Sequence, residues 1–170
     1  MMLSQNQKIV MVKAPVADCY AAGSSDIVDV RLYQHLTFVA LMGVAGGADR
    51  ITFTVDACDD NGPTNTAQCP LYYRIGSGSL PDTLAALTHQ ETAATGTGSL
   101  LAAACVATQH IIEVEVSDLL KVGVDAATAF VTAGARLTWA TSAAGGIVGA
   151  VLAILSKPRI ADDTMPAGLL

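Results

Sequence analysis

The chain has 170 residues, which corresponds to a single domain by the usual range of about 100–200 residues. Hydrophobic residues make up 52% of it and charged residues only 14%, against a typical charged share of about 25%. This composition excludes disorder of the whole chain, which requires low hydrophobicity and high charge. The formal net charge of −6 also argues against a nucleic-acid-binding domain that works through a basic patch.

The low charge and a mean hydropathy of +0.47 leave two explanations, a membrane protein or a subunit that buries surface in an assembly. The longest weakly polar run, residues 143–155, contains three glycines. It is also shorter than the roughly 20 residues of a membrane-spanning helix. Residues 1–12 lack the sustained apolar core of a signal peptide. We therefore expect a cytosolically made, self-associating subunit without a membrane segment and without direct nucleic-acid contact.

The first half of the chain alternates between apolar and polar residues, a period of two that predicts β-strands. Residues 29–44 are expected to form one long strand, and residues 50–57 a second that is rich in β-branched and aromatic side chains. Residues 59–63, with the sequence DDNGP, are the strongest turn signal because Asn-Gly readily adopts positive φ angles. Residues 71–75 follow as a strand, and we expect the strands on either side of the turn to form an antiparallel hairpin.

The second half begins with a long segment, residues 76–108, that is rich in Gly, Ser, Thr and Ala. Long segments without apolar periodicity are usually functional or mobile, so we expect an excursion over the surface or across a partner. Residues 109–116 predict a strand with a solvated acidic face, and residues 117–120 a short helical turn or a corner. Residues 129–141 are expected as a strand pair, or as one strand bent at Gly134.

The last predicted strand, residues 147–156, is apolar on both faces. Such a strand is expected to be buried by the core on one side and by a partner or an arm on the other. The single tryptophan, Trp139, lies in an apolar strand and is expected to anchor the core or an interface. The candidate interface residues are Trp139, Val148, Val151, Leu152, Ile154, Leu169 and Leu170.

Many strands, long loops and almost no helix predict an all-β fold, a single β-sandwich or jelly-roll-like domain. The pattern offers no repeated crossover helices, which a βαβ fold requires. We expect the β domain to span residues 13–160, with the excursion over residues 76–108 included. Extended arms are expected over residues 1–12 and 161–170, and we expect them to become ordered only in an assembly.

Four cysteines are present, and they form neither a CxxC motif nor a metal-site spacing. They are Cys19, Cys58, Cys69 and Cys105. Cys58 and Cys69 flank the predicted turn, so they are the pair that a hairpin would bring face to face. Free buried thiols are the expected state in a cytosolic protein.

Other reactive residue types have structural explanations. Residues 56–61 gather oxygen ligands of the kind that calcium prefers, but they lack the EF-hand spacing, and Asp and Asn are common in turns. The three histidines have no zinc-ligand spacing. Glu113 and Glu115 share one strand face and are expected on a solvated surface rather than as a glycosidase pair. We assign no catalytic, cofactor-binding or metal residues, and we expect neither a cofactor nor an enzyme.

A recognisable order of segments runs from about Val30 to Ile160, over most of the chain. The sequence TFTV at residues 52–55 precedes the acidic turn, EVEVSDL at residues 113–119 precedes the late strands, and LSKPR at residues 155–159 closes the last apolar run. In these segments the chain resembles a group of small virion proteins of tailed bacteriophages. Members of this group are described as head decoration (cement) proteins or as other structural proteins, and the group has no catalytic residues to carry over.

The resemblance implies a protein that clamps neighbouring capsid subunits, with the major capsid protein as its partner and a trimer favoured for its self-association. It implies a place on the capsid surface of the virion, after assembly in the host cytoplasm. A virion position in the tail tube, neck or tail-completion assembly is an alternative, and so is a β-sandwich module that binds a sugar or protein ligand. We expect association by hydrophobic contact and β-edge pairing, with little salt sensitivity.

Overall fold

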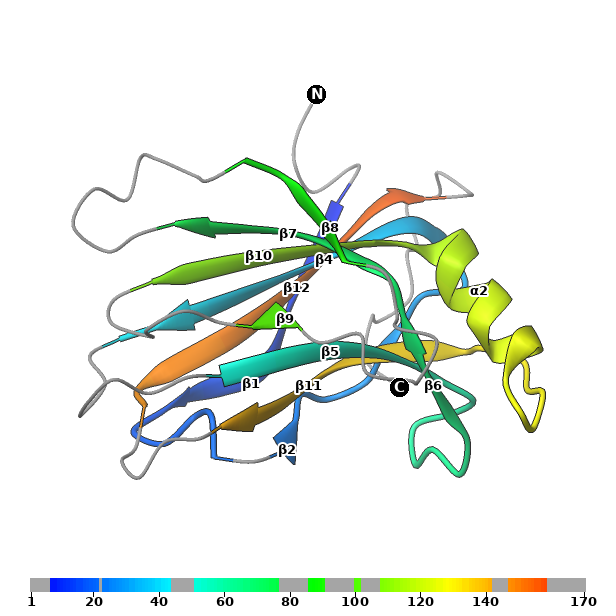
Figure 1. The fold of residues 1–170 in the computed structure, drawn as a ribbon, viewed down its shortest axis with the longest axis horizontal. Coiled ribbons are helices and arrows are strands. Elements are labelled where there is room, and N and C mark those ends of the chain that lie inside the picture. The colour runs from blue at the N-terminus through cyan, green and yellow to red at the C-terminus, as the bar shows by residue number, and fades with distance from the viewer. Residues whose placement is uncertain are drawn as a thin grey trace.

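The computed structural model describes residues 7–21, 23–43, 51–76, 86–90, 100–101, 108–141 and 147–158. Within these residues the chain forms two antiparallel β-sheets, called sheet A and sheet B below, and one helix. The strands run along the long axis of the molecule, and the helix lies at one end of it (Figure 1).

Sheet A contains the first and the last of the described strands, β1 and β12. Its strand order is β1-β12-β4-β10-β7-β8. These strands are β1 (Gln7–Val16), β12 (Gly149–Pro158), β4 (Tyr33–Met42), β10 (Gln109–Glu115), β7 (Leu71–Gly76) and β8 (Thr88–Gln90). The central strand, β4, is paired along its length with β12 on one side and β10 on the other.

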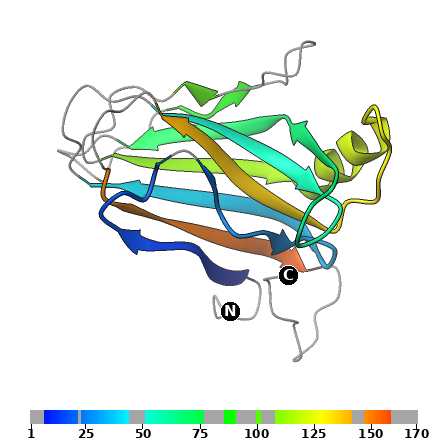
Figure 2. The same ribbon diagram turned by 90° about the horizontal axis from the view of Figure 1, so that it is seen from below.

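Sheet B has the strand order β2-β11-β5-β6, with two further short strands beside it. The four strands are β2 (Gly23–Ser24), β11 (Gly134–Thr141), β5 (Ile51–Cys58) and β6 (Thr66–Cys69). The short strand β3 (Val28–Asp29) pairs with β11, and β9 (Leu100–Leu101) pairs with β5. Seen from below, β11 and β5 lie on one side of the molecule and β12 and β1 on the other (Figure 2).

The strand order of the described residues is that of a jelly roll. We number the main strands in chain order as β1, β2 with β3, β4, β5, β6, β10, β11 and β12. Sheet A then reads 1-8-3-6 and sheet B reads 2-7-4-5. This is the double Greek-key arrangement of jelly-roll domains, to which β7 and β8 add an extension of sheet A. The predicted all-β, jelly-roll-like fold is confirmed.

Alternation along the strands places the core between the two sheets. In β4, Leu36, Phe38 and Ala40 are fully buried, and the residues between them are partly exposed. In β5, Phe53 and Val55 are fully buried in the same way. Fully burying a side chain such as Leu or Phe contributes about 1.5–3 kcal/mol, so these inward rows are the main source of the fold's stability.

The chain passes from sheet B to sheet A at Pro70, the one residue between β6 and β7. Proline has no N–H to donate and so does not continue a hydrogen-bonded ladder. The predicted hairpin between the strands over residues 50–57 and 71–75 is therefore wrong, because these strands belong to different sheets. Across the turn, β5 pairs with β6, whereas the strand predicted over residues 71–75 pairs with β10 in the other sheet.

The helix α2 (Val116–Asp125) is longer than the short turn predicted over residues 117–120. Its buried side consists of Val116, Leu119 and Gly123. A Cβ atom at Gly123 would lie 2.4 Å from the Thr132 hydroxyl oxygen, so this close approach requires glycine. Valine and glycine have low helix propensity, and the helix is stabilised mainly by its packing against the sandwich, which a local pattern does not reveal.

Several predicted boundaries also change. Residues 7–12 belong to β1 and not to an N-terminal arm, because residues 7–11 pair in register with residues 152–156 of β12. The long strand predicted from residue 29 begins at residue 33, and β11 begins at Gly134, which is therefore not a bend within a strand. Residues 1–6, the predicted arm over residues 161–170 and most of the excursion over residues 76–108 lie outside the described residues.

Candidate functional site

The outer face of sheet A, the side turned away from sheet B, carries a group of neighbouring apolar side chains. Because side chains alternate along a strand, the buried positions of β4 leave Val39 and Leu41 on this outer face. Val39 lies opposite Leu152 of β12 and Ile111 of β10, and Leu152 in turn lies opposite Met11 of β1. A row of four apolar side chains therefore crosses four neighbouring strands.

A second row lies two residues along the strands, where Ile9 of β1 is opposite Ile154 of β12. Ile9 and Met11 are 51% and 52% exposed, and Leu41 is 40% exposed. The remaining members are partly exposed. We call the set the apolar patch, and it consists of Ile9, Met11, Val39, Leu41, Ile111, Leu152 and Ile154. Contiguous exposed apolar surface of this kind marks an interaction site.

Polar side chains border the apolar patch toward one end of β4 and β10. Nδ1 of His35 is 3.1 Å from Oε1 of Glu115, and Nε2 of the same ring is 4.0 Å from Oε2 of Glu113. Both glutamate side chains are partly exposed, so the predicted solvated acidic face of this strand is confirmed. An apolar centre with a charged border is the usual anatomy of a protein–protein interface.

The edge strand β1 contributes to the apolar patch but is poorly suited to adding another strand. Its register to β12 shifts between Met11 and Lys13 and again between Lys13 and Val16. Pro15 removes one backbone donor from the same half of the strand. Bulges, lysines and prolines are the features that protect a sheet edge from pairing, so the predicted β-edge association is disfavoured here.

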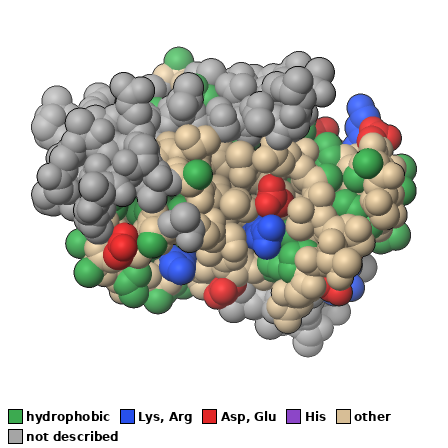
Figure 3. Space-filling model, turned by 60° about the horizontal axis from the view of Figure 1, so that its bottom comes forward, with side chains coloured by type: hydrophobic (Ala, Val, Ile, Leu, Met, Phe, Trp, Pro, Cys, Tyr) green, Lys and Arg blue, Asp and Glu red, His purple; other side chains and the backbone are tan. Residues whose placement is uncertain are grey.

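The outer face of sheet B is polar. Direct cross-strand pairs join Thr54 to Thr138 and Asp56 to Arg136. Nε of Arg136 donates to Oδ2 of Asp56 over 3.3 Å, and the Thr138 hydroxyl donates to the same oxygen over 2.8 Å. Figure 3 views this side of the molecule, and the part not drawn in grey has mainly backbone and uncharged polar groups at its centre. Asp56, Arg136 and Thr138 of this face are therefore joined by hydrogen bonds within the chain.

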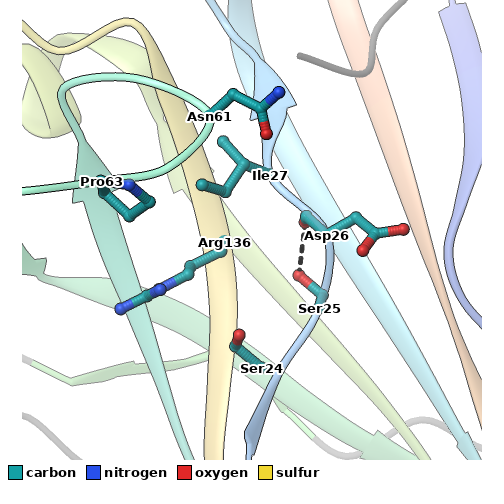
Figure 4. A pocket seen from close by; sticks show the side chains of 7 residues that line it. All are labelled: Ser24, Ser25, Asp26, Ile27, Asn61, Pro63 and Arg136. Atoms are coloured by element: carbon teal, nitrogen blue, oxygen red, sulfur yellow. Dashed lines mark hydrogen bonds between the residues drawn. The ribbon is translucent and has the colours of Figure 1, made fainter.

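A pocket of about 250 Å³ opens beside Arg136 (Figure 4). It is lined by Ser24, Ser25, Asp26, Ile27, Asn61, Pro63 and Arg136. The Ser25 hydroxyl is engaged within the chain, since it donates to the Asp26 carbonyl and accepts from the backbone N–H of Leu137. The lining residues include no histidine or cysteine. The pocket suits hydrogen bonding to a small polar ligand.

Trp139 and Val151, two predicted interface residues, are corrected by the structure, because they lie in the core with 3% and 0% exposure. The Trp139 indole packs edge-on against Tyr20, with ring centroids 5.5 Å apart. Its Nε1 donates to the carbonyl oxygen of Ala21 over 2.7 Å. The polar atom of the ring is thus satisfied inside the chain, and Trp139 anchors the core, the other of its two expected roles.

The remaining predicted interface residues lie elsewhere. Leu152 and Ile154 belong to the apolar patch, and Val148, just before β12, is 50% exposed. Leu169 and Leu170 lie outside the described residues. For β12 the sequence therefore identified an apolar strand with two faces but did not separate its inward from its outward side chains.

Part of the apolar patch was not identified from the sequence. β1 contributes Ile9 and Met11 from a segment that was expected to be an arm, and β4 contributes Val39 and Leu41. In β4 the sequence does contain an indication, because apolar residues occupy both faces of the strand toward its end. Apolar residues on both faces are also the pattern that predicted a doubly buried strand over residues 147–156, which forms β12.

The turn between β5 and β6 is closed by its own side chains. Oδ2 of Asp59 accepts hydrogen bonds from the backbone and side-chain nitrogens of Asn65, over 3.1 and 2.9 Å, and Oδ1 of Asp60 accepts one from Gly62 N. The side-chain bond from Asn65 holds the pKa of Asp59 below its usual range. Within the described ranges, no group of three His, Cys, Asp or Glu residues is arranged to hold a metal ion.

Cys58 and Cys69 do not face each other, because Cys58 lies opposite Thr66 and Cys69 opposite Val55. Both are buried free thiols, and so is Cys19, which confirms the expected state for these three. Burial raises the pKa of the Cys58 thiol to about 12 and also raises the pKa of Cys69. The thiolate, which is the reactive form of cysteine, is therefore suppressed at both positions.

His110 lies on the inner face of β10 and is only 1% exposed. Its Nε2 is 3.4 Å from the Thr108 hydroxyl oxygen, and its ring packs 5.6 Å from the ring of Phe53. Burial lowers the pKa of His110 to about 4, so the ring is neutral at pH 7. It packs as a core side chain, whereas His35 belongs to the border of the apolar patch.

Comparison with known proteins adds little to this description. No protein-family model matches the chain, and no curated protein matches it. Among solved structures, the chain is similar to the Eiger TNF from S. frugiperda, with 11% identity and a TM-score of 0.29 over 96% of this chain and 93% of that chain. A likeness at this level carries no functional argument. No helix in the described part of the chain combines the length and hydropathy needed to cross a bilayer.

Proposed function

We propose that the chain is a virion structural protein that decorates the capsid shell of a tailed bacteriophage and stabilises it by bridging neighbouring capsid subunits. Its partners on the capsid surface are the major capsid protein and further copies of the chain itself. Two observations support the proposal, the segment order that resembles small phage virion proteins and the apolar patch on sheet A. The jelly roll agrees with this role, since it is a fold of viral capsid domains among others, but a fold alone does not decide a function.

The apolar patch is the observation that carries the proposal. The chain has few charged residues, 14%, and yet leaves large apolar side chains exposed together on one sheet face. Covering apolar surface contributes about 25 cal/mol per Å², so a face of this kind gains free energy when another surface packs on it. Such a surface is typical of a subunit that works by association rather than by chemistry.

The direct test is the number of copies in purified virions, measured by quantitative mass spectrometry against the major capsid protein. A ratio near one to one is expected, because a decoration protein covers the whole shell. A few copies to some dozens would overturn the decoration role in favour of the neck, tail tube or tail-completion assembly. Absence from the particle would overturn every virion role.

A second test measures the stabilisation itself. Shells that lack the chain are mixed with the purified protein and heated, and their disruption is followed by light scattering. The wild-type chain is expected to raise the disruption temperature, and Leu41→Asp, in the apolar patch, is expected to lose most of that gain. Thr54→Asp, on the outer face of sheet B, is the matched control and should keep it. Equal behaviour of shells with and without the wild-type chain would contradict the proposal.

The pocket beside Arg136 favours a second candidate function, a β-sandwich module that binds a sugar-like ligand. Of the five N–H donors of Arg136, the bond to Asp56 uses the one on Nε. Glucuronate is a suitable probe, because it offers a carboxylate to Arg136 and hydroxyls to Ser24 and Asn61. Binding that is detected by NMR titration and weakened in Ser24→Ala would support this candidate, and the absence of any shift at millimolar glucuronate would remove it.

A further inference from the structure

We propose that Asn61 is a self-modification site, where the chain deamidates its own side chain with the Asp60 carboxylate as the base. The inference concerns the turn between β5 and β6 and does not depend on the proposed function. Three features of the described residues support it. Asn61 and Gly62 are exposed, the backbone nitrogen of Gly62 is unhindered, and a carboxylate is already bonded to the N–H of that nitrogen.

The reaction is an attack of a backbone nitrogen on the side chain of the preceding residue. The nitrogen of Gly62 forms a bond to Cγ of Asn61, and the bond between Cγ and Nδ2 breaks. The proton of the Gly62 N–H passes to Asp60 and from there to the leaving nitrogen, which departs as ammonia. Water then opens the cyclic succinimide, so residue 61 becomes aspartate or isoaspartate. Because both reacting groups belong to one chain, the reaction needs no encounter between molecules.

Asn61 lies in the open part of the turn. It is exposed, and so are its neighbours Asp60 and Gly62. Figure 4 shows its side chain at the margin of the pocket, with no hydrogen bond to the other lining residues. Among the residues that the structure describes, none holds the Asn61 amide by a hydrogen bond. The side chain can therefore rotate toward the nitrogen of Gly62, and water has access to the product of the attack.

Gly62 presents its nitrogen without steric hindrance. Glycine has no Cβ beside the attacking atom, unlike every other residue type. The space around it is open as well, because a Cβ at Gly62 would meet no atom beyond its chain neighbours within 4 Å. The φ angle of Gly62 lies outside the left-handed range. An alanine at this position is thus expected to fit the fold and to hinder only the attack.

Asp60 has the geometry of a general base for this attack. Its Oδ1 accepts a hydrogen bond from the N–H of Gly62 over 2.8 Å. A general base must lie within about 2.6–3.2 Å of the atom from which it takes a proton. The N–H of Gly62 is bonded to a carboxylate rather than to a peptide carbonyl of the sheet, so the proton has an acceptor as the nitrogen attacks.

Asn65, in the same turn, provides an internal comparison. Its side-chain nitrogen donates to Oδ2 of Asp59 over 2.9 Å, and this bond holds the amide in place. The next residue, Thr66, belongs to β6, and its branched Cβ crowds the nitrogen that would have to attack. We therefore expect deamidation at Asn61 and not at Asn65.

The product alters the pocket beside Arg136, because Asn61 is one of its lining residues. Conversion of the amide to a carboxylate adds one negative charge to the formal −6 of the chain. The charged residues that line the pocket are Asp26 and Arg136, and Figure 4 shows the Asp26 carboxylate turned away from Arg136. Ageing of the folded chain is thus expected to change the charge of this pocket.

The first experiment follows the purified, folded chain during incubation at neutral pH and physiological temperature. Peptide mass spectrometry measures the conversion of amide to acid at both asparagines of the turn, and labelling by an isoaspartyl methyltransferase detects isoaspartate. Asn61 is expected to convert at least about tenfold faster than Asn65, because only Asn61 has an unhindered nucleophile beside it. Conversion of Asn61 at the rate of Asn65 or more slowly would overturn the site.

Two variants test the roles of the neighbouring residues. Gly62→Ala should slow the conversion of Asn61 at least about tenfold while its urea unfolding stays that of the wild type, since the added Cβ crowds only the attacking nitrogen. Asp60→Ser keeps a hydrogen-bond acceptor but removes the carboxylate, and it should slow the conversion about tenfold or more. An unchanged or faster rate in Asp60→Ser would overturn Asp60 as the base, because the hydrogen bond would then not promote the attack.

The same incubation in urea separates the effect of the fold from that of the Asn-Gly sequence. Unfolding keeps the sequence but removes the fixed contact between Asp60 and the N–H of Gly62. The folded chain should therefore convert Asn61 faster than the unfolded chain, and the reverse order would overturn the assisted reaction. None of these measurements involves virions or capsid shells, so their failure and the failure of the decoration role are distinguishable.

Discussion

The outer faces of sheets A and B are both made by strands that alternate between inward and outward side chains, yet they are chemically opposite. On sheet A several outward positions of the central strands are aliphatic, as at Val39 and Leu152, with His35 and the glutamates of β10 at their border. On sheet B the corresponding positions hold cross-strand threonines and the ion pair of Asp56 with Arg136. The ion pair and the Thr138 hydroxyl satisfy one another within the chain, whereas exposed aliphatic side chains gain free energy only when they are covered.

The largest expected effect is a loss of stability at acid pH that comes from the inner face of sheet A. His110 lies on that inner face, and His35 lies on the outer face of the same sheet. Burial holds the pKa of His110 at about 4, below the ordinary value of 6.5, so the folded chain keeps this ring neutral. Between pH 6.5 and 4 the unfolded chain binds a proton that the folded chain does not. The free energy of unfolding should therefore fall by up to about 3 kcal/mol as the pH is lowered through this range, and be fully restored above it.

Urea unfolding at intervals from pH 7 to pH 4 checks this pH dependence. His110→Gln should remove most of the slope, because glutamine does not titrate. His35→Gln is the matched control on the outer face, because it removes a histidine from the same sheet and leaves the buried His110 ring in place. The assignment to the inner face would be wrong if the two variants had the same pH profile.

The next effect concerns the ion pair on sheet B. Asp56 is 7% exposed, and Asp56→Ala leaves the donors of Arg136 and Thr138 without their acceptor. We expect a loss of about 2 kcal/mol in the free energy of unfolding, with no change in the mass of the oligomer. Asp26→Ala, which removes an exposed carboxylate, should change the stability little. A change of mass in Asp56→Ala would show that sheet B also takes part in association.

Two neighbouring residues of β12 allow the core and the outer face to be compared directly by substitution. Val151 is fully buried and Leu152 faces outward. Val151→Ala should lower the free energy of unfolding by about 2 kcal/mol, because it leaves a cavity between the sheets. Leu152→Ala, measured at a concentration where the chain is monomeric, should lower it by less than about 1 kcal/mol. Similar losses in the two variants would contradict the placement of Leu152 outside the core.

The smallest effect is an exchange of nearly isosteric residues between the two faces. Val39→Thr should change the stability of the monomer by less than about 0.5 kcal/mol and weaken its self-association several-fold, since it puts a hydroxyl in the apolar patch. Thr54→Val makes the opposite change on sheet B and should leave the association constant unaltered. Sedimentation over a concentration series measures both constants.

The local pattern was a reliable guide to strand character and to the fold class. The strands predicted over residues 50–57 and 109–116 correspond closely to β5 and β10, and the turn over residues 59–63 connects two antiparallel strands. Alternation is a property of neighbouring residues, so it can be found without knowing the partner strand. The helix α2 was underpredicted because tertiary packing, rather than local propensity, supplies most of its stability.

The candidate site was predicted only in part, for a related reason. An apolar residue on each face of β12 was evident, but Leu152 and Ile154 could not be told from Val151 without knowing where sheet B lies. Ile9 and Met11 were missed because the pairing of β1 with β12 joins the two ends of the described chain. No local pattern records a contact over that distance.

Composition and alternation alone thus settled the all-β class, the position of several strands and the surplus of apolar side chains over what one core needs. Strand order, the switch of sheets at Pro70 and the burial of Trp139 emerged only from the folded arrangement. These features depend on pairings between residues far apart in the chain, such as residues 7–11 with residues 152–156, whose free energy is gained only when both sheets form together. The choice of which apolar row becomes core and which becomes surface follows from that long-range pairing.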